Sequence, residues 1–135
     1  MSLKTPPVYF HVQRKTPFTK TGSVVTFDRE ILNVGDAMDA ESGTFIAPTS
    51  GIYYFSISGI SSPNSGSLSL SLMKNGEPVG AAFARRSEYD TFALSSTLEL
   101  EVDDVITVFL KSGYIHDEVN SYTNFNGLLL RNESM

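Results

Sequence analysis

The chain has 135 residues, of which 41% are hydrophobic and 19% charged, which suffices for one packed core and not for two. Its 10 basic and 15 acidic side chains give a net charge of −5, which repels nucleic acid and anionic membrane surfaces, so we expect neither as a partner. The sequence has no cysteine, which excludes disulfides, thiolate metal sites and cysteine nucleophiles. No apolar run approaches the ~18 residues of a membrane-spanning helix, so we expect no membrane insertion, and residues 1–10 lack the apolar core of a signal peptide.

Alternating apolar and polar residues recur between Gly, Pro, Asn and Ser along the chain, which is typical of the strands of a sandwich or barrel. In chain order, we expect strands at residues 8–14, 23–27, 43–47, 51–60, 68–74, 79–85, 91–102, 105–111 and 122–130. Asn75-Gly76 suits the positive φ angles of a tight hairpin, and Asp103-Asp104 suits a turn. The prediction is an all-β fold with one domain at residues 8–131, a flexible segment or added remnant at residues 1–7, and a tail at residues 132–135.

Some predicted strands carry large apolar side chains on both faces. Adjacent residues of a strand point to opposite faces of the sheet. Tyr54 is therefore expected on the face opposite to Tyr53, and Phe109 on the face opposite to Val108. An antiparallel sandwich normally keeps one face of each sheet wet, so a loop, a ligand or another copy of the chain must cover the second apolar face. Ordinary exposure of scattered apolar residues is the alternative. If another copy provides the cover, the predicted interface residues are Tyr54, Val105, Thr107, Phe109 and Leu128.

The spacing of several residues resembles the globular head domain of complement C1q and its relatives. The matching positions are Phe27, Asn33, Met38, Phe45 and the run Gly51-x-Tyr53-x-Phe55, followed in the same order by LSLMKNGEPV, LELEVDDVITVFL and YTNFNGLLL. Three positions depart from the pattern, because Met38 and Ile57 replace larger or aromatic residues and Asp103 replaces a turn glycine. An Asp tolerates positive φ, so we expect the turn to form.

This resemblance implies a ten-stranded jelly roll like that of the tumour necrosis factors, with three copies packed around a threefold axis. It also implies a secreted, extracellular protein without enzyme activity that acts in innate immunity. Such a lectin-like recognition module would bind glycans, microbial surfaces or partner proteins through its loops. The alternative is a signalling ligand, similar to tumour necrosis factors or cerebellins, that engages a cell-surface receptor. The matched residues have structural roles in this interpretation; they are Phe27, Asn33, Phe45, Gly51, Tyr53, Phe55, Phe125 and Gly127.

The motifs of catalysis are missing from the sequence. The two histidines, His11 in a predicted strand and His116 in a loop, have no nearby partner that suggests a triad or a zinc site. Neither a Gly-x-Ser-x-Gly elbow nor a phosphate-binding loop occurs. We therefore expect no enzyme activity and no required cofactor.

Ligand binding is expected in the loops at residues 61–65, 85–90 and 113–121, because a rigid sandwich presents its connecting segments at one end. Arginine forks bind carboxylates and tyrosine rings stack on sugars, so an acidic glycan or a protein surface suits the second loop, with an ordinary charged turn as the alternative. Its candidate residues are Arg85, Arg86, Glu88 and Tyr89.

Calcium is the one cofactor that the resemblance leaves open. Asp90 matches one position at which some relatives bind calcium on the threefold axis, whereas the positions around Ala82 and Phe83 do not match. A solvated loop carboxylate is the alternative. Separately, Asn132-Glu133-Ser134 matches the N-glycosylation acceptor pattern.

Overall fold

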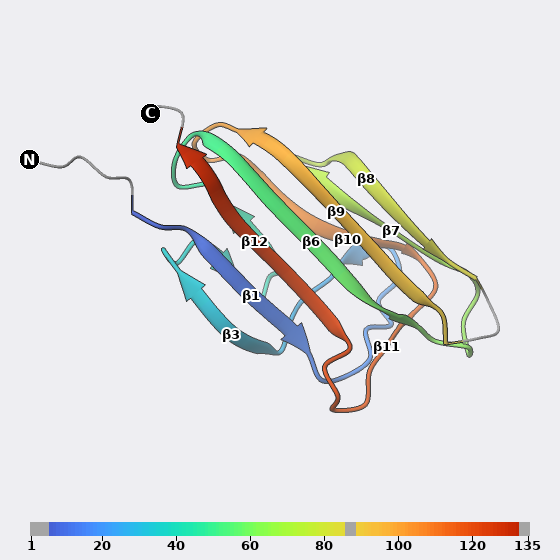
Figure 1. Cartoon of the computed structure of the whole chain (residues 1–135). Coiled ribbons are helices and arrows are strands. Elements are labelled where there is room, and N and C mark those ends of the chain that lie inside the picture. The colour runs from blue at the N-terminus through green and yellow to red at the C-terminus, as the bar shows by residue number, and fades with distance from the viewer. Residues whose placement is uncertain (1–5, 86–88, 133–135) are drawn as a thin grey trace, which may run out of the picture.

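The computed structural model describes residues 6–85 and 89–132. They form two antiparallel sheets packed face to face (Figure 1). The β6 sheet contains β9 (Thr91–Leu100), β6 (Gly51–Ser61), β12 (Thr123–Asn132), β11 (Ile115–His116), β1 (Tyr9–Arg14) and β3 (Arg29–Val34). The β10 sheet contains β8 (Glu77–Ala84), β7 (Leu68–Lys74), β10 (Val105–Ser112), β2 (Ser23–Val24), β5 (Thr44–Ile46) and β4 (Met38–Asp39). No helix capable of crossing a membrane occurs in the described part of the chain.

The core lies between the sheets and is built by the predicted alternation. In β6, every second residue is buried along the whole strand, because successive side chains of a strand point to opposite faces. Tyr53 is fully buried, and its hydroxyl donates a 2.7 Å hydrogen bond to the carbonyl oxygen of Thr49, while burial raises the pKa of this hydroxyl. The aromatic residues of the family pattern pack together in this core; they are Phe27, Phe45, Tyr53, Phe55 and Phe125.

Local contacts explain why Asn33, Gly51 and Gly127, the remaining residues of the family pattern, occupy their positions. The side chain of Asn33 donates a 2.7 Å hydrogen bond to the carbonyl of Met38, which ties the end of β3 to β4. At Gly127, an added Cβ would lie 2.8 Å from the Phe55 ring, so only glycine lets the aromatic rings approach the strand. A Cβ at Gly51 would collide with the carbonyl oxygen of Arg131 in the paired strand β12.

The predicted turns are confirmed. Asn75 and Gly76 both have positive φ, at 52° and 82°, and connect β7 to β8 as a hairpin. Asp103 adopts a φ of 71°, which explains how it replaces the usual glycine of the turn before β10.

Several strands differ from the prediction, including the short strands β4 and β11, which were not predicted. Strand β3 was not predicted, because it is an edge strand that pairs with β1 alone and its residues show no burial alternation. The predicted strand at residues 23–27 contains only two strand residues. Strand β12 continues to Asn132, so the first residue of the predicted tail belongs to a strand.

The ends of the sandwich differ in what they carry. Strand β12 ends where β6 begins, because Asn132 is paired with Gly51. Leu100, the last residue of β9, also pairs with Gly51, so the β9–β10 turn lies at this same end. We call this the proximal end. The opposite, distal end carries residues 61–67, 85, 89–90 and 113–122 (Figure 1).

Candidate interaction surfaces

The three loops that were predicted to bind ligands meet at the distal end. The N–H of Ser61 donates to the carbonyl of Asp90 at 2.8 Å, and the N–H of Asp90 donates to the Ser61 hydroxyl at 3.1 Å. The N–H of Ser62 donates to the carbonyl of Tyr114 at 3.0 Å, and the N–H of Tyr114 donates to the Ser65 hydroxyl at 2.9 Å. These bonds join the three loops into one surface.

The distal surface is rich in exposed aromatic and apolar side chains. Tyr89 and Tyr122 both pack near His116, with ring centroids 4.8 Å and 6.3 Å from that of the imidazole. Tyr89 is 60% exposed and Val119 is 75% exposed. With Tyr114, three of the chain's six tyrosines are exposed at this one end.

The loop at residues 117–122 is held by one buried carboxylate. Asp117 is 1% exposed and accepts backbone N–H bonds from Glu118 and Ser121 at 2.9 Å and from Thr123 at 3.3 Å. Such bonds order the segment that donates them. The ends of this loop are therefore fixed to each other and to β12.

The buried side chain of Arg14 supports the same region. Its guanidinium donates to the carbonyls of Thr26 at 2.6 Å and Pro17 at 3.0 Å and lies 5.0 Å from the centroid of the Phe18 ring. Burial lowers the pKa of Arg14, and the charges of Asp28 and, less strongly, Asp117 oppose this effect. We interpret Arg14 as a structural residue, because its donors are used within the domain.

The residues of the predicted ligand loop have different environments. Arg85 and Tyr89 are exposed at the distal end, whereas Arg86 and Glu88 lie outside the described residues. The Asp90 carboxylate accepts the N–H of Arg85 at 3.1 Å and lies 3.8 Å from its Nε. Within residues 6–85 and 89–132, no group of three or more His, Cys, Asp or Glu side chains could hold a metal ion. A cation bound by Asp90 would compete with Arg85 for this carboxylate.

The outer face of the β6 sheet carries an apolar row. The pairing registers align Tyr9 with Leu128, Leu128 with Tyr54, and Tyr54 with Thr97. Tyr9 is 42% exposed and Leu128 is 36% exposed. Directly opposed residues on one face lie close enough to form one contact surface, so the apolar row Tyr9–Leu128–Tyr54 is continuous across three strands and ends at Thr97 of the fourth.

Polar residues lie beside this apolar row. His11 is aligned with Asn126, and Gln13 is aligned with Asn124. The Asn124 side-chain oxygen lies 2.7 Å from Nε2 of His11 and accepts a 2.8 Å bond from Gln13. The outer face of the β6 sheet therefore combines an aromatic and aliphatic row with small and polar residues.

A second apolar surface lies on β8, the edge strand of the β10 sheet. Phe83 is 66% exposed and Val79 is 37% exposed, with exposed Ala81 between them. Strand β8 contacts β9, the edge strand of the β6 sheet (Figure 1). This surface was not predicted from the sequence, although Val79 and Phe83 alternate with small residues in the segment 79–84.

The five predicted interface residues do not form one surface. Tyr54 and Leu128 are direct neighbours on the outer face of the β6 sheet. Val105, Thr107 and Phe109 are half-buried on the outer face of the β10 sheet. Because the outer faces of two packed sheets point in opposite directions, one flat partner surface cannot contact both groups.

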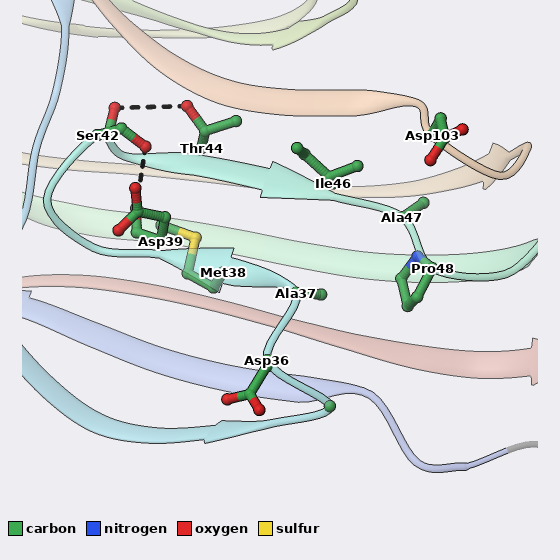
Figure 2. A pocket seen from close by; sticks show the side chains of 11 residues that line it. Asp36, Ala37, Met38, Asp39, Ser42, Thr44, Ile46, Ala47, Pro48 and Asp103 are labelled. Atoms are coloured by element: carbon green, nitrogen blue, oxygen red, sulfur yellow. Dashed lines mark hydrogen bonds between the residues drawn. The ribbon is translucent and has the colours of Figure 1, made fainter.

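A cleft of about 460 Å³ opens near β4 and β5 (Figure 2). The carboxylates of Asp36, Asp39 and Asp103 lie around it, and Ile46 and Pro48 supply apolar surface. This cleft was not predicted from the sequence, although all of its lining residues except Asp103 lie in the one segment 35–48. Its acidic lining suits a cationic group better than an anion.

The strand order of the two sheets and the loops gathered at one end define a jelly-roll sandwich. The chain matches the C1q domain family over residues 9–130 and belongs to this family, which confirms the resemblance.

Among curated proteins, it is 26% identical over 125 residues to the complement C1q tumor necrosis factor-related protein 3 of human and of mouse, covering 91% of this chain and 51% of each relative. The chain thus spans about half the length of these relatives.

Solved structures support the same fold. The globular domain of the zebrafish complement 1qA protein superposes with a TM-score of 0.75 at 22% identity, covering 93% of this chain and 98% of that one. Murine APRIL superposes with a TM-score of 0.72 at 15% identity, covering 92% and 99% of the two chains. The Eiger TNF of S. frugiperda gives 0.68 at 12% identity, covering 95% of each chain.

Proposed function

We propose that the chain is a non-enzymatic, secreted recognition module that assembles as a homotrimer and binds glycans, microbial surfaces or partner proteins through its distal end. The observation that carries this proposal is the distal surface itself, where three hydrogen-bonded loops expose Tyr89, Tyr114 and Tyr122. Tyrosine, serine, asparagine and glycine are enriched in the binding loops of antibodies, because they combine large contact area with adaptable hydrogen bonding. Residues 61–67 and 113–122 have this composition.

The two exposed apolar surfaces support self-association. The β8 surface and the Tyr9–Leu128–Tyr54 row lie on different sides of the molecule. An isologous dimer uses one surface twice, whereas a heterologous ring joins two different surfaces of each subunit. We therefore place Val79 and Phe83 of one copy against Tyr54 and Leu128 of the next. The family resemblance supplies the number of copies, three.

Rotational symmetry would make the three distal ends equivalent. Each copy would present its loops in the same direction along the axis, so a surface with repeated ligands could engage several at once. Multivalent binding of this kind raises the apparent affinity without any new contact.

Two measurements test the proposal. Light scattering after size exclusion should give about three times the chain mass of 14.8 kDa, and a mass of a single chain at micromolar concentration would contradict the trimer. A glycan array tests recognition, and sugar-competed binding that is lost when Tyr89 and Tyr122 are replaced by serine would support the distal end. Capture of a receptor ectodomain without sugar dependence would favour the signalling ligand instead.

A further inference from the structure

We propose that the ligand of the distal end is a protein and that Val119 is the central contact, inserting into an apolar socket of that partner. This inference rests on the proposed function, because it takes the distal end as the recognition surface and narrows its ligand to one class.

Val119 combines two features that are each unfavourable for an isolated domain. Its side chain is 75% exposed, and its φ is +73°. A β-branched residue is a genuine outlier in the left-handed region, where glycine and asparagine are far better tolerated. Strained backbone of this kind persists where the surrounding structure enforces it, and it gathers at binding and active sites. Folding alone gives no reason for valine at this position.

The surrounding structure holds Val119 in place. Its N–H donates a 2.8 Å bond to the carbonyl of Lys15, and Asp117 ties both sides of the loop through its backbone hydrogen bonds. The Asn120 side chain donates a 3.0 Å bond to the Tyr122 hydroxyl. The valine is therefore presented in one conformation before binding, which lowers the entropy cost of association.

The chemistry around Val119 favours a protein over a sugar or a membrane. The aliphatic side chain offers no hydrogen bond to a hydroxylated ligand, whereas apolar and tyrosine anchors within a polar rim are typical of protein interfaces. Glu118 precedes Val119 in the chain, and the chain carries −5 overall, which disfavours an anionic lipid surface. A protein with an apolar pocket inside a polar or basic rim fits this surface.

The test uses the substitution Val119→Asn, because asparagine relieves the backbone strain while removing the apolar contact. All proteins are produced in a bacterial host without N-glycosylation, because the substitution creates an Asn-x-Ser pattern with Ser121. The matched control is Val102→Asn. Val102 is 52% exposed at the proximal end, and its φ is not positive. A phage-displayed library of random peptides is selected on the full-length wild-type protein, and the recovered peptides are measured by interferometry against wild type and both variants.

We expect recovered peptides with apolar or aromatic anchors, at least tenfold weaker binding to Val119→Asn, and less than twofold change for Val102→Asn. At one protein concentration, Val119→Asn should melt about 3–6 °C above wild type, because the strain is removed. A variant that is more stable and yet binds more weakly separates a binding role from a structural one.

Several results would overturn the inference. One is that no peptide is recovered, and another is that the recovered peptides bind the Val119→Asn variant with the same affinity as wild type. A third is that vesicles of phosphatidylcholine and phosphatidylserine, and not peptides, bind in a way that depends on Val119. Glycan binding that requires Tyr89 and Tyr122 but is indifferent to Val119 would also overturn it, while leaving the recognition module intact. Single-chain mass together with no binding at the distal end would instead contradict the proposed function.

Discussion

Replacing Phe83 by serine should dissociate the proposed trimer without unfolding the subunit. Phe83 is 66% exposed in the single chain, and a phenylalanine side chain buries on the order of 150–250 Å² when fully covered. Covering the exposed part against a neighbour would remove about 100–150 Å² from water, which corresponds to about 3 kcal/mol per contact at ~25 cal/mol/Å².

A closed ring of three repeats this contact at every interface. The loss is therefore about 9 kcal/mol for each trimer. Because the midpoint concentration of a monomer–trimer equilibrium varies as the square root of the dissociation constant, it should rise by roughly three orders of magnitude. The fold should remain, since the side chain contributes little to the core.

Light scattering over a dilution series from nanomolar to hundreds of micromolar gives the midpoint directly. Val102→Ser is the control, because it removes an exposed valine of the proximal end. If Phe83→Ser stays trimeric with an unchanged midpoint concentration, the proposed contact between Phe83 of one copy and the Tyr54 and Leu128 surface of the next is wrong. If instead Phe109→Asp alone dissociates the assembly, the interface lies over the central strand β10 on the outer face of the β10 sheet rather than at its β8 edge.

Three further predictions concern stability and metal binding. Gly127→Ala should lower the free energy of unfolding by at least about 1–3 kcal/mol in urea, because its Cβ would overlap the Phe55 ring. The hydrogen bond from Asn75 lowers the pKa of Asp104 below its ordinary 3.8. The ionised Asp104 therefore stabilises the folded state above pH 3.8, and this contribution to the free energy of unfolding is lost as the pH falls through the lower native pKa. The slope of melting temperature against pH below 4 should therefore be shallower in Asp104→Asn, and an identical slope would contradict this reason. Millimolar calcium should not change the melting temperature, because an arginine already pairs with Asp90; a rise that Asp90→Asn abolishes would establish calcium binding.

The candidate site could be predicted from the sequence only in part. The three distal loops were predicted because turn residues interrupt the strands there, and Tyr89 was named as a ligand residue. The grouping of Tyr89 with His116 and Tyr122 depends on contacts between segments far apart in the chain. The positive φ of Val119 has no sequence signal, because valine is among the residues least expected in that conformation.

The sequence by itself determined which side chains of the long core strands face the core and where several turns lie, because strand alternation and turn preference act over a few residues. It therefore identified Tyr53 as a core residue and predicted the hairpin at Asn75-Gly76. Only the tertiary structure decided which outward residues share a surface. Tyr54 and Phe109 both point away from the core, yet they lie on opposite faces of the sandwich. The sheet to which a strand belongs depends on pairing between segments that are distant in the sequence.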